Sequence, residues 1–217
     1  MTVPEIPYTA AWPQETDVTP PVTVRVSRSG YPALAFRGEM PHDRDHHGVL
    51  WRRQIIAPGR GRPVAGRVHS HRQRTAMTDL LCHVSADPAL SGHALHDTPP
   101  SGELSASRTL FLLSAEVREG HVTATPPLCH RCAPRVARAR GSRKRSYTAV
   151  LVDEVRPWGV AGLLYDPTTL RPHPAADGGL TAVRYRSPRA PWVVAHQALI
   201  SLHGITPVRL KLRSSAA

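Results

Sequence analysis

The chain has 217 residues, with 41% hydrophobic and only 5% aromatic side chains, and it contains 22 prolines. This length can bury a full core, and the proline content favours a globular centre with long connections over a compact, regular fold. The 28 Lys and Arg residues exceed the 16 Asp and Glu residues, and the net charge of +12 predicts a polyanionic partner such as nucleic acid. The N-terminal residues lack the basic and apolar regions of a signal peptide, and no apolar run approaches the roughly 18 residues that a membrane span needs. We therefore expect a cytoplasmic protein without a membrane segment.

The first two thirds of the chain predict short strands around one helix. Residues 1–21 are proline-rich and predict a flexible N-terminal arm. Residues 22–26 alternate apolar and polar side chains, which predicts a strand with residues 32–37 as its hairpin partner. Ser70 is a suitable N-cap, and apolar residues at three-to-four-residue spacing predict a helix from there to Cys82. Further strands are predicted at 48–56, 109–113 and 121–125.

The last third predicts two helices and several strands. Residues 135–140 form a predicted short basic helix. Pro191 begins a second predicted helix, whose apolar stripe ends before Gly204. Strands are predicted at 147–152, 159–165, 180–186 and 205–212. The sequence therefore predicts an α+β fold with short antiparallel strands and about three helices, divided into the arm, an α+β domain over 22–165, and a strand–helix–strand extension over 166–217 that packs on the same core.

The three cysteines form the most informative pattern in the sequence. Cys129 and Cys132 make a C-x-x-C pair, and thiolates at that spacing can both bind one zinc ion at about 2.3 Å. An odd cysteine count in a chain without an export signal favours metal binding or reduced thiols over disulfides. Cys82 follows a predicted helix, two strands joined by a turn come next, and the C-x-x-C pair begins another helix. This order predicts a treble-clef-like zinc-finger core with zinc as the cofactor.

The fourth zinc ligand is the weak point of this interpretation. Position 85, where a second knuckle cysteine is expected, is Ser85, whose hydroxyl stays protonated at neutral pH and binds zinc poorly. A histidine can substitute, with His83 nearest and His93 and His96 further on, or water can fill an open position. Alternatively, the metal has been lost, or the three cysteines are simply small buried apolar residues. We take the three cysteines and His83 as the predicted ligand set.

Two short motifs carry a resemblance to a known family. Residues 72–77 have the sequence R-Q-R-T-A-M and lead to C-H-V-S at 82–85, and residues 126–133 have the sequence P-P-L-C-H-R-C-A. Over about residues 44–165 the chain resembles a family of uncharacterised actinobacterial and phage-associated proteins, in which an R-Q-R-x-x-M helix enters a C-Q-V-C-G knuckle and P-P-V-C-x-x-C-A follows. The resemblance implies a zinc-finger-like core. The chain departs from this pattern at His83, Ser85 and Ala86, which replace glutamine, cysteine and glycine.

Two arginine-rich segments, 52–74 and 131–145, contain no acidic residue. In a helix that starts near residue 130, arginines at 131, 135 and 138 share one face, where guanidinium groups can grip phosphates. Aromatic residues do not interleave the two segments, so backbone contact is favoured over base stacking; a solvated charge run is the alternative. The predicted nucleic-acid-binding residues are Arg72, Arg74, Arg131, Arg135, Arg138, Arg140, Arg143, Lys144 and Arg145.

Three functions remain open at this point. The leading hypothesis is a non-enzymatic, zinc-finger-like protein that binds the nucleic-acid backbone. A metal-dependent nuclease or hydrolase with an open or degenerate zinc site is the second, although the absence of any asparagine argues against a His-Asn-His nuclease built on the acid–histidine cluster at 43–47. The third is a protein-interaction module whose basic surface meets an acidic protein. His196 and His203 lie seven residues apart on the predicted C-terminal helix, where half-buried structural roles are expected.

Overall fold

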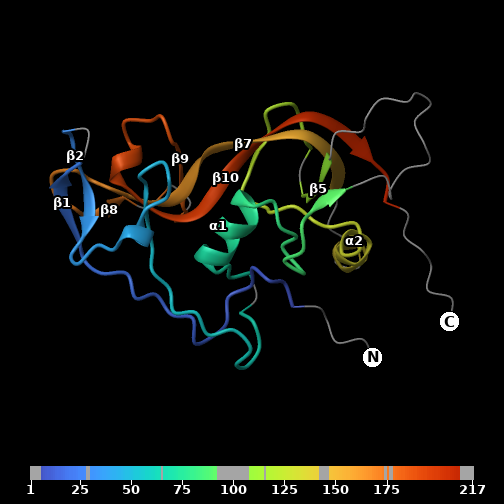
Figure 1. Ribbon diagram of the computed structural model, residues 1–217, viewed down its shortest axis with the longest axis horizontal. Coiled ribbons are helices and arrows are strands. Elements are labelled where there is room, and N and C mark those ends of the chain that lie inside the picture. The colour runs from blue at the N-terminus through green and yellow to red at the C-terminus, as the bar shows by residue number, and fades with distance from the viewer. Residues whose placement is uncertain are drawn as a thin grey trace. The chain divides into compact units, whose positions relative to one another are not determined.

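The computed structural model describes residues 6–27, 30–64, 66–91, 108–114, 116–141, 147–173, 175 and 178–210 (Figure 1). These residues form ten strands, two α-helices and two 3-10 turns. The fold is therefore mostly β, and the predicted α+β treble-clef fold with about three helices is wrong. Within the described part of the chain, no helix is both long enough and apolar enough to cross a membrane.

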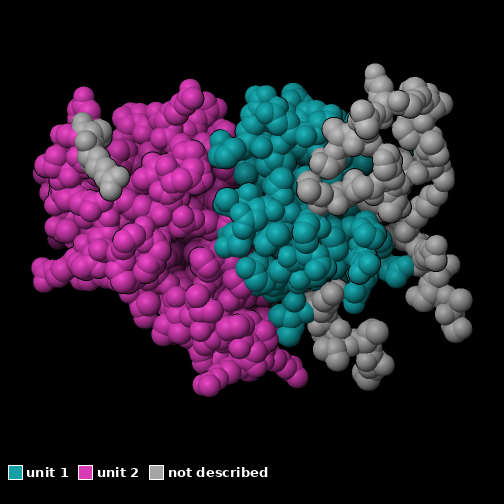
Figure 2. Space-filling model, viewed as in Figure 1, with its two compact units in different colours: residues 1–9, 75–157, 200–217 teal, residues 10–74, 158–199 magenta. Residues whose placement is uncertain are grey.

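The chain forms two compact units, each built from segments far apart in sequence (Figure 2). Unit 1 comprises residues 1–9, 75–157 and 200–217, and unit 2 comprises residues 10–74 and 158–199. Strands β7 (Thr148–Tyr165) and β10 (Val193–Val208) each begin in one unit and end in the other. Helix α1 (Ser70–Thr78) does the same.

Unit 1 is built around strand β5, and its own elements are β4 (Leu90–Ser91), β5 (Arg108–Leu113), β6 (Val122–Thr123) and α2 (Ala133–Gly141). β5 pairs antiparallel with the first part of β7, with Phe111 opposite Val150, and β4 pairs with the other edge of β5. Residues 109–113 are all buried, which explains why this strand is a continuous apolar run without alternation. The unit's core is a cluster of small and aliphatic side chains that includes Val84, Leu110, Leu112, Leu128, Ala133, Ala137, Ala149, Leu151 and the three cysteines.

Unit 2 contains the hairpin of β1 (Val22–Val26) and β2 (Pro32–Phe36), the 3-10 turns Pro41–Asp43 and Ala190–Trp192, and strands β3 (Leu50–Trp51), β8 (Pro172–His173) and β9 (Thr181–Arg184). β3 runs parallel to the start of β10, while β8 and β9 pair antiparallel with the end of β7. Leu34, Phe36, Leu50 and Val194 form the apolar cluster that joins the hairpin to this sheet.

Several predicted elements differ from the structure. The segment predicted as a C-terminal helix after Pro191 is strand β10, and the strands predicted at 147–152 and 159–165 are parts of the single strand β7. The two strands expected to form a hairpin before the C-x-x-C pair do not pair together, because β5 pairs with β7 and β6 pairs with β10. The strand predicted over 48–56 is limited to Leu50–Trp51. Helix α2 and the hairpin of β1 and β2 are confirmed within one or two residues, whereas helix α1 begins near the predicted start but ends at Thr78, before Cys82.

Candidate metal centre

Cys82 lies in a tight turn that follows helix α1. Leu80 takes a left-handed backbone conformation (φ 50°), and the Leu81 amide donates to the Ala76 carbonyl at 2.9 Å, which ends the helix. Four residues after Cys82, the Ala86 amide donates to the Cys82 carbonyl at 2.9 Å, and Ala86 is also left-handed (φ 62°). The glycine that the resembled family has at this position would adopt this conformation without strain.

Cys129 and Cys132 lie in the turn that starts helix α2. The amides of Cys132 and Ala133 both donate to the Cys129 carbonyl, at 3.2 and 3.1 Å. Just before this turn, the Leu128 amide donates to the Leu110 carbonyl at 2.9 Å, which anchors the turn on strand β5. The C-x-x-C pair is therefore held between a buried strand and a helix start, as its sequence position predicted.

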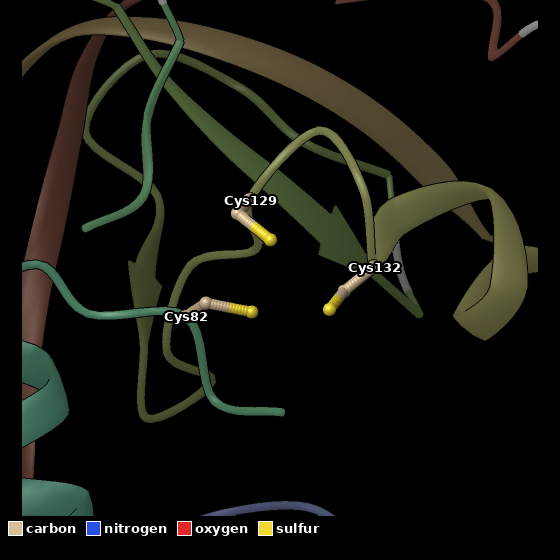
Figure 3. A group of neighbouring side chains, drawn as sticks. All are labelled: Cys82, Cys129 and Cys132. Atoms are coloured by element: carbon tan, nitrogen blue, oxygen red, sulfur yellow. The ribbon is translucent and has the colours of Figure 1, made fainter. Parts of the chain in front are cut away.

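The two cysteine-bearing turns are joined directly, because the His83 amide donates to the Pro127 carbonyl at 3.0 Å. The three side chains point toward a common space (Figure 3), and their sulfur atoms all lie within 4.8 Å of one another. A tetrahedral zinc site with Zn–S bonds of about 2.3 Å places its sulfurs about 3.8 Å apart. A small inward movement of the thiols therefore accommodates one ion.

Burial and hydrogen bonds shift the pKa values of Cys82 and Cys132 in opposite directions. Burial raises the pKa of Cys132 to about 12, and the neighbouring Cys129 thiol adds to this effect. Burial would also raise the pKa of Cys82, but hydrogen bonds from the backbone of Cys129, Ser85 and Val84 outweigh it and lower that pKa. The backbone is therefore arranged to stabilise negative charge on the sulfur of Cys82.

Ser85 lies next to this group of thiols. Its hydroxyl oxygen lies 3.8 Å from the Cys129 sulfur, and it also hydrogen-bonds the thiols of Cys82 and Cys132, which lowers the pKa of each. In a tetrahedral site with three sulfurs and one oxygen, an oxygen–sulfur edge measures about 3.5 Å, given the usual bond lengths. The side chain at the position that the sequence marked as defective therefore lies beside the cysteine group, close to the Cys129 sulfur.

His83, the fourth predicted ligand, does not join the thiols. Its Nδ1 atom lies 3.4 Å from the Pro126 carbonyl oxygen. Among the described residues, the group of ligand atoms within 4.8 Å of one another consists of the three cysteines. His93 and His96, the alternative histidines, lie outside the described residues.

Helix α2 carries the predicted basic surface that lies closest to the cysteines. Arg131, Arg135 and Arg138 are all exposed, and they begin directly beside the C-x-x-C turn. The side chain of Arg140 and residues 143–145 lie outside the part of the chain that the structure describes. Arg135 and Arg138 lie three residues apart on one face of helix α2, whereas Arg131 precedes the helix, which begins at Ala133 and not near residue 130 as the sequence predicted.

Arg72, also predicted to bind nucleic acid, is buried in unit 2 and is not available to do so. Its guanidinium group makes two bonds to the Glu15 carboxylate, at 2.7 and 2.6 Å, and a third to the Ala10 carbonyl at 2.6 Å. Arg74 is half-buried, and its guanidinium carbon lies 4.9 Å from the centre of the Trp51 ring. The arginines of the R-Q-R motif thus have structural contacts inside the protein.

The acid–histidine cluster at 43–47 organises a loop of unit 2. The buried Asp45 carboxylate accepts hydrogen bonds from the Val49 amide at 3.0 Å and from Trp51 Nε1 at 2.9 Å. His47 is exposed and stacks on Tyr185, with 3.7 Å between ring centres. These contacts hold the loop before strand β3.

No family model, curated protein or solved structure matches this chain. The functional conclusion therefore depends on the geometry of the cysteine group and on the helix next to it.

Proposed function

We propose that this protein binds one zinc ion through Cys82, Cys129 and Cys132, and that the ion fixes the start of helix α2, whose arginines contact the phosphate backbone of nucleic acid. The observation that carries the proposal is the convergence of the three buried thiols within 4.8 Å. Thiolate donors in a small, buried, near-tetrahedral arrangement suit Zn²⁺ better than hard ions such as Mg²⁺ or Ca²⁺.

The surroundings favour a structural site over a catalytic one. Catalytic zinc sites keep one position open for water or substrate. Here the Ser85 hydroxyl lies 3.8 Å from the Cys129 sulfur, close enough to serve as a fourth ligand, and the three cysteines are at most 6% exposed. We infer that the ion cross-links the two turns of unit 1, with Ser85 as a weak fourth ligand.

Metal analysis of the purified, reduced protein tests the zinc site. We expect one zinc ion per chain, retained through gel filtration, and loss of that ion in the Cys132→Ser variant. The matched control is Ser187→Ala, an altered serine in unit 2, which should keep the full zinc content. A wild-type protein that is folded, carries no zinc and takes none up from a buffered zinc solution would overturn the proposal.

The case for nucleic acid comes from the position of the arginines on α2. Ala133 and Ala137 of this helix are buried against unit 1, which turns the opposite face, with Arg135 and Arg138, outward. Arg131 lies between the two cysteine ligands of the C-x-x-C turn, so its backbone position depends directly on the metal. Guanidinium groups in this arrangement can bind successive phosphates without sequence preference.

The salt dependence of binding to a labelled DNA or RNA duplex tests this second part. Each phosphate contact contributes about 0.9 to the slope of log affinity against log salt, so a triple Arg→Gln variant at 131, 135 and 138 should lower the slope by about 2 to 3. Arg118→Gln, an exposed arginine of the same unit, is the control and should lower it by much less. Absence of binding, salt-independent binding, or an unchanged slope in the triple variant would contradict the proposal.

A further inference from the structure

A second group of polar side chains in unit 1 has the geometry of a nucleophilic triad. Ser201 and His203 lie on strand β10 two residues apart and therefore share one face, on which Ser201 is 8% exposed and His203 is half-buried; Leu202 between them is fully buried on the other face. The His203 Nε2 atom lies 3.0 Å from the Ser201 hydroxyl oxygen, and its Nδ1 atom lies 2.9 Å from a carboxylate oxygen of Glu119.

The hydrogen bonds define which ring nitrogen carries the proton. The Glu119 carboxylate accepts a hydrogen bond at 3.1 Å from the Gly204 amide, and this second contact fixes its position beside the imidazole. Gly204 takes a left-handed conformation (φ 65°), and a Cβ atom there would come within 2.5 Å of the Asp153 carboxylate, so glycine is needed at this place. Because a carboxylate accepts hydrogen bonds, the Nδ1 atom of His203 must donate, and Nε2 is left as the acceptor for the Ser201 hydroxyl.

We propose that Ser201 is an activated nucleophile for small carboxylic esters, with His203 as the general base and Glu119 as the positioning residue. The Ser201 oxygen attacks the ester carbonyl carbon while its proton moves to Nε2 of His203. The carbon–oxygen bond to the leaving alcohol then breaks, and that alcohol takes the proton from His203. Water hydrolyses the resulting acyl-serine by the same route and restores the free hydroxyl.

One feature of the strand limits the rate of this chemistry. In many serine hydrolases, the backbone amide after the nucleophile stabilises the oxyanion. Here the Leu202 amide already donates to the His121 carbonyl at 3.0 Å, so it does not serve that purpose. Loss of one oxyanion donor costs about 100-fold to 1000-fold in rate. We therefore expect covalent labelling of Ser201 to be easier to detect than turnover.

A fluorophosphonate probe, which forms a stable bond to activated serine hydroxyls with loss of fluoride, tests the proposal. We expect peptide mass spectrometry to place the adduct on Ser201, with no adduct in Ser201→Ala and a rate at least about 100-fold lower in His203→Gln. Ser187→Ala is the matched control and should label at the wild-type rate. No adduct on the wild-type protein, an adduct elsewhere, or an unchanged rate in His203→Gln would overturn the proposal, provided that urea unfolding shows the variants to be folded.

Glu119→Gln separates a positioning role from a purely structural one. An amide can donate to Nδ1, which favours the other imidazole tautomer and places a proton on Nε2, where it blocks the transfer from Ser201. We expect the ¹⁵N spectrum of His203 to change tautomer and the labelling rate to fall, with the urea midpoint unchanged. An unchanged tautomer together with an unchanged labelling rate would remove Glu119 from the site.

Discussion

The buried carboxylate of Glu15 gives the sharpest prediction of stability. Glu15 is fully buried in unit 2, and its oxygens accept two bonds from Arg72, one from the Trp12 amide at 2.9 Å and one from the Ala57 amide at 3.1 Å. Glu15→Gln keeps the size and shape of the side chain but removes its charge. The guanidinium of Arg72 is then left buried beside a neutral partner.

The magnitude follows from the proton affinity of the carboxylate. Burial alone would raise the pKa of Glu15, but the bonds from Arg72, Trp12 and Ala57 lower it from 4.5 to about 2. A decrease of this size is equivalent to about 3 kcal/mol of folding free energy at pH 7, in line with the known cost of breaking a buried ion pair. Because the folded-state pKa is the lower one, this stabilisation is complete above pH 4.5 and disappears as the pH falls toward 2. At pH 3 about 1.4 kcal/mol remains.

Urea unfolding followed by tryptophan fluorescence measures this difference. We expect Glu15→Gln to lower the free energy of unfolding by about 3 kcal/mol at pH 7 and by about half as much at pH 3. Glu116→Gln is the control, because the Glu116 carboxylate is exposed and pairs with the exposed Arg118, and it should change nothing measurable at either pH. A loss that is the same at both pH values, or no loss at pH 7, would refute the electrostatic explanation.

Three further predictions concern the metal centre and the core. Ser85→Cys should tighten zinc binding at least tenfold, or by about 1.4 kcal/mol, because a fourth thiolate replaces a hydroxyl. Competition with a chelating dye measures the zinc affinity. Equal or weaker binding would show that residue 85 does not face the ion. Gly162→Ala should lower unfolding stability by about 1 to 3 kcal/mol in urea, because the added Cβ would lie 2.2 Å from the Val194 carbonyl oxygen. Gln73→Leu should cost about 2 kcal/mol or more by the same assay, because the Gln73 amide group bonds both the N–H (2.8 Å) and the C=O (3.0 Å) of Ala198.

Patterns between neighbouring residues correctly predicted the elements whose formation depends mainly on neighbouring residues. The alternation over residues 22–26 correctly placed the hairpin, and the predicted start of helix α1 was right within one residue, because Ser70 is its first residue and His69, not Ser70, precedes it as the cap. The C-terminal helix failed because most of the residues in β10 from Val193 to Leu202 are buried, so the strand shows no alternation. Its apolar spacing then fits a helix as well as a strand, and only the pairing with distant segments decides between them.

The grouping of the three cysteines was predictable from the sequence, but the predicted fourth ligand, His83, is not part of the group, and the surroundings could not be inferred. The element order correctly indicated that Cys82, Cys129 and Cys132 belong together, since each lies in a turn next to a helix end. It also marked Ser85 as a departure at the expected second knuckle position, and the hydroxyl of this residue lies 3.8 Å from the Cys129 sulfur. The ion pair of Arg72 with Glu15 could not be inferred from the sequence. Glu15 belongs to the proline-rich N-terminal segment, 57 residues before Arg72, and the run of basic residues around Arg72 does not indicate that this carboxylate pairs with it.

The geometry of unit 1 makes the proposed nucleic-acid binding depend on the proposed zinc binding, but not the reverse. The proposed metal ligands Cys129 and Cys132 lie just before helix α2, whereas the arginines at 135 and 138 are exposed on the helix and are not part of the cysteine group. Loss of zinc in Cys132→Ser should therefore weaken nucleic-acid binding although every arginine is retained. Loss of the arginines should leave the zinc content unchanged. If instead the zinc-free variant binds nucleic acid with the wild-type salt slope, the metal does not orient α2, and the basic surface acts independently of the cysteine group.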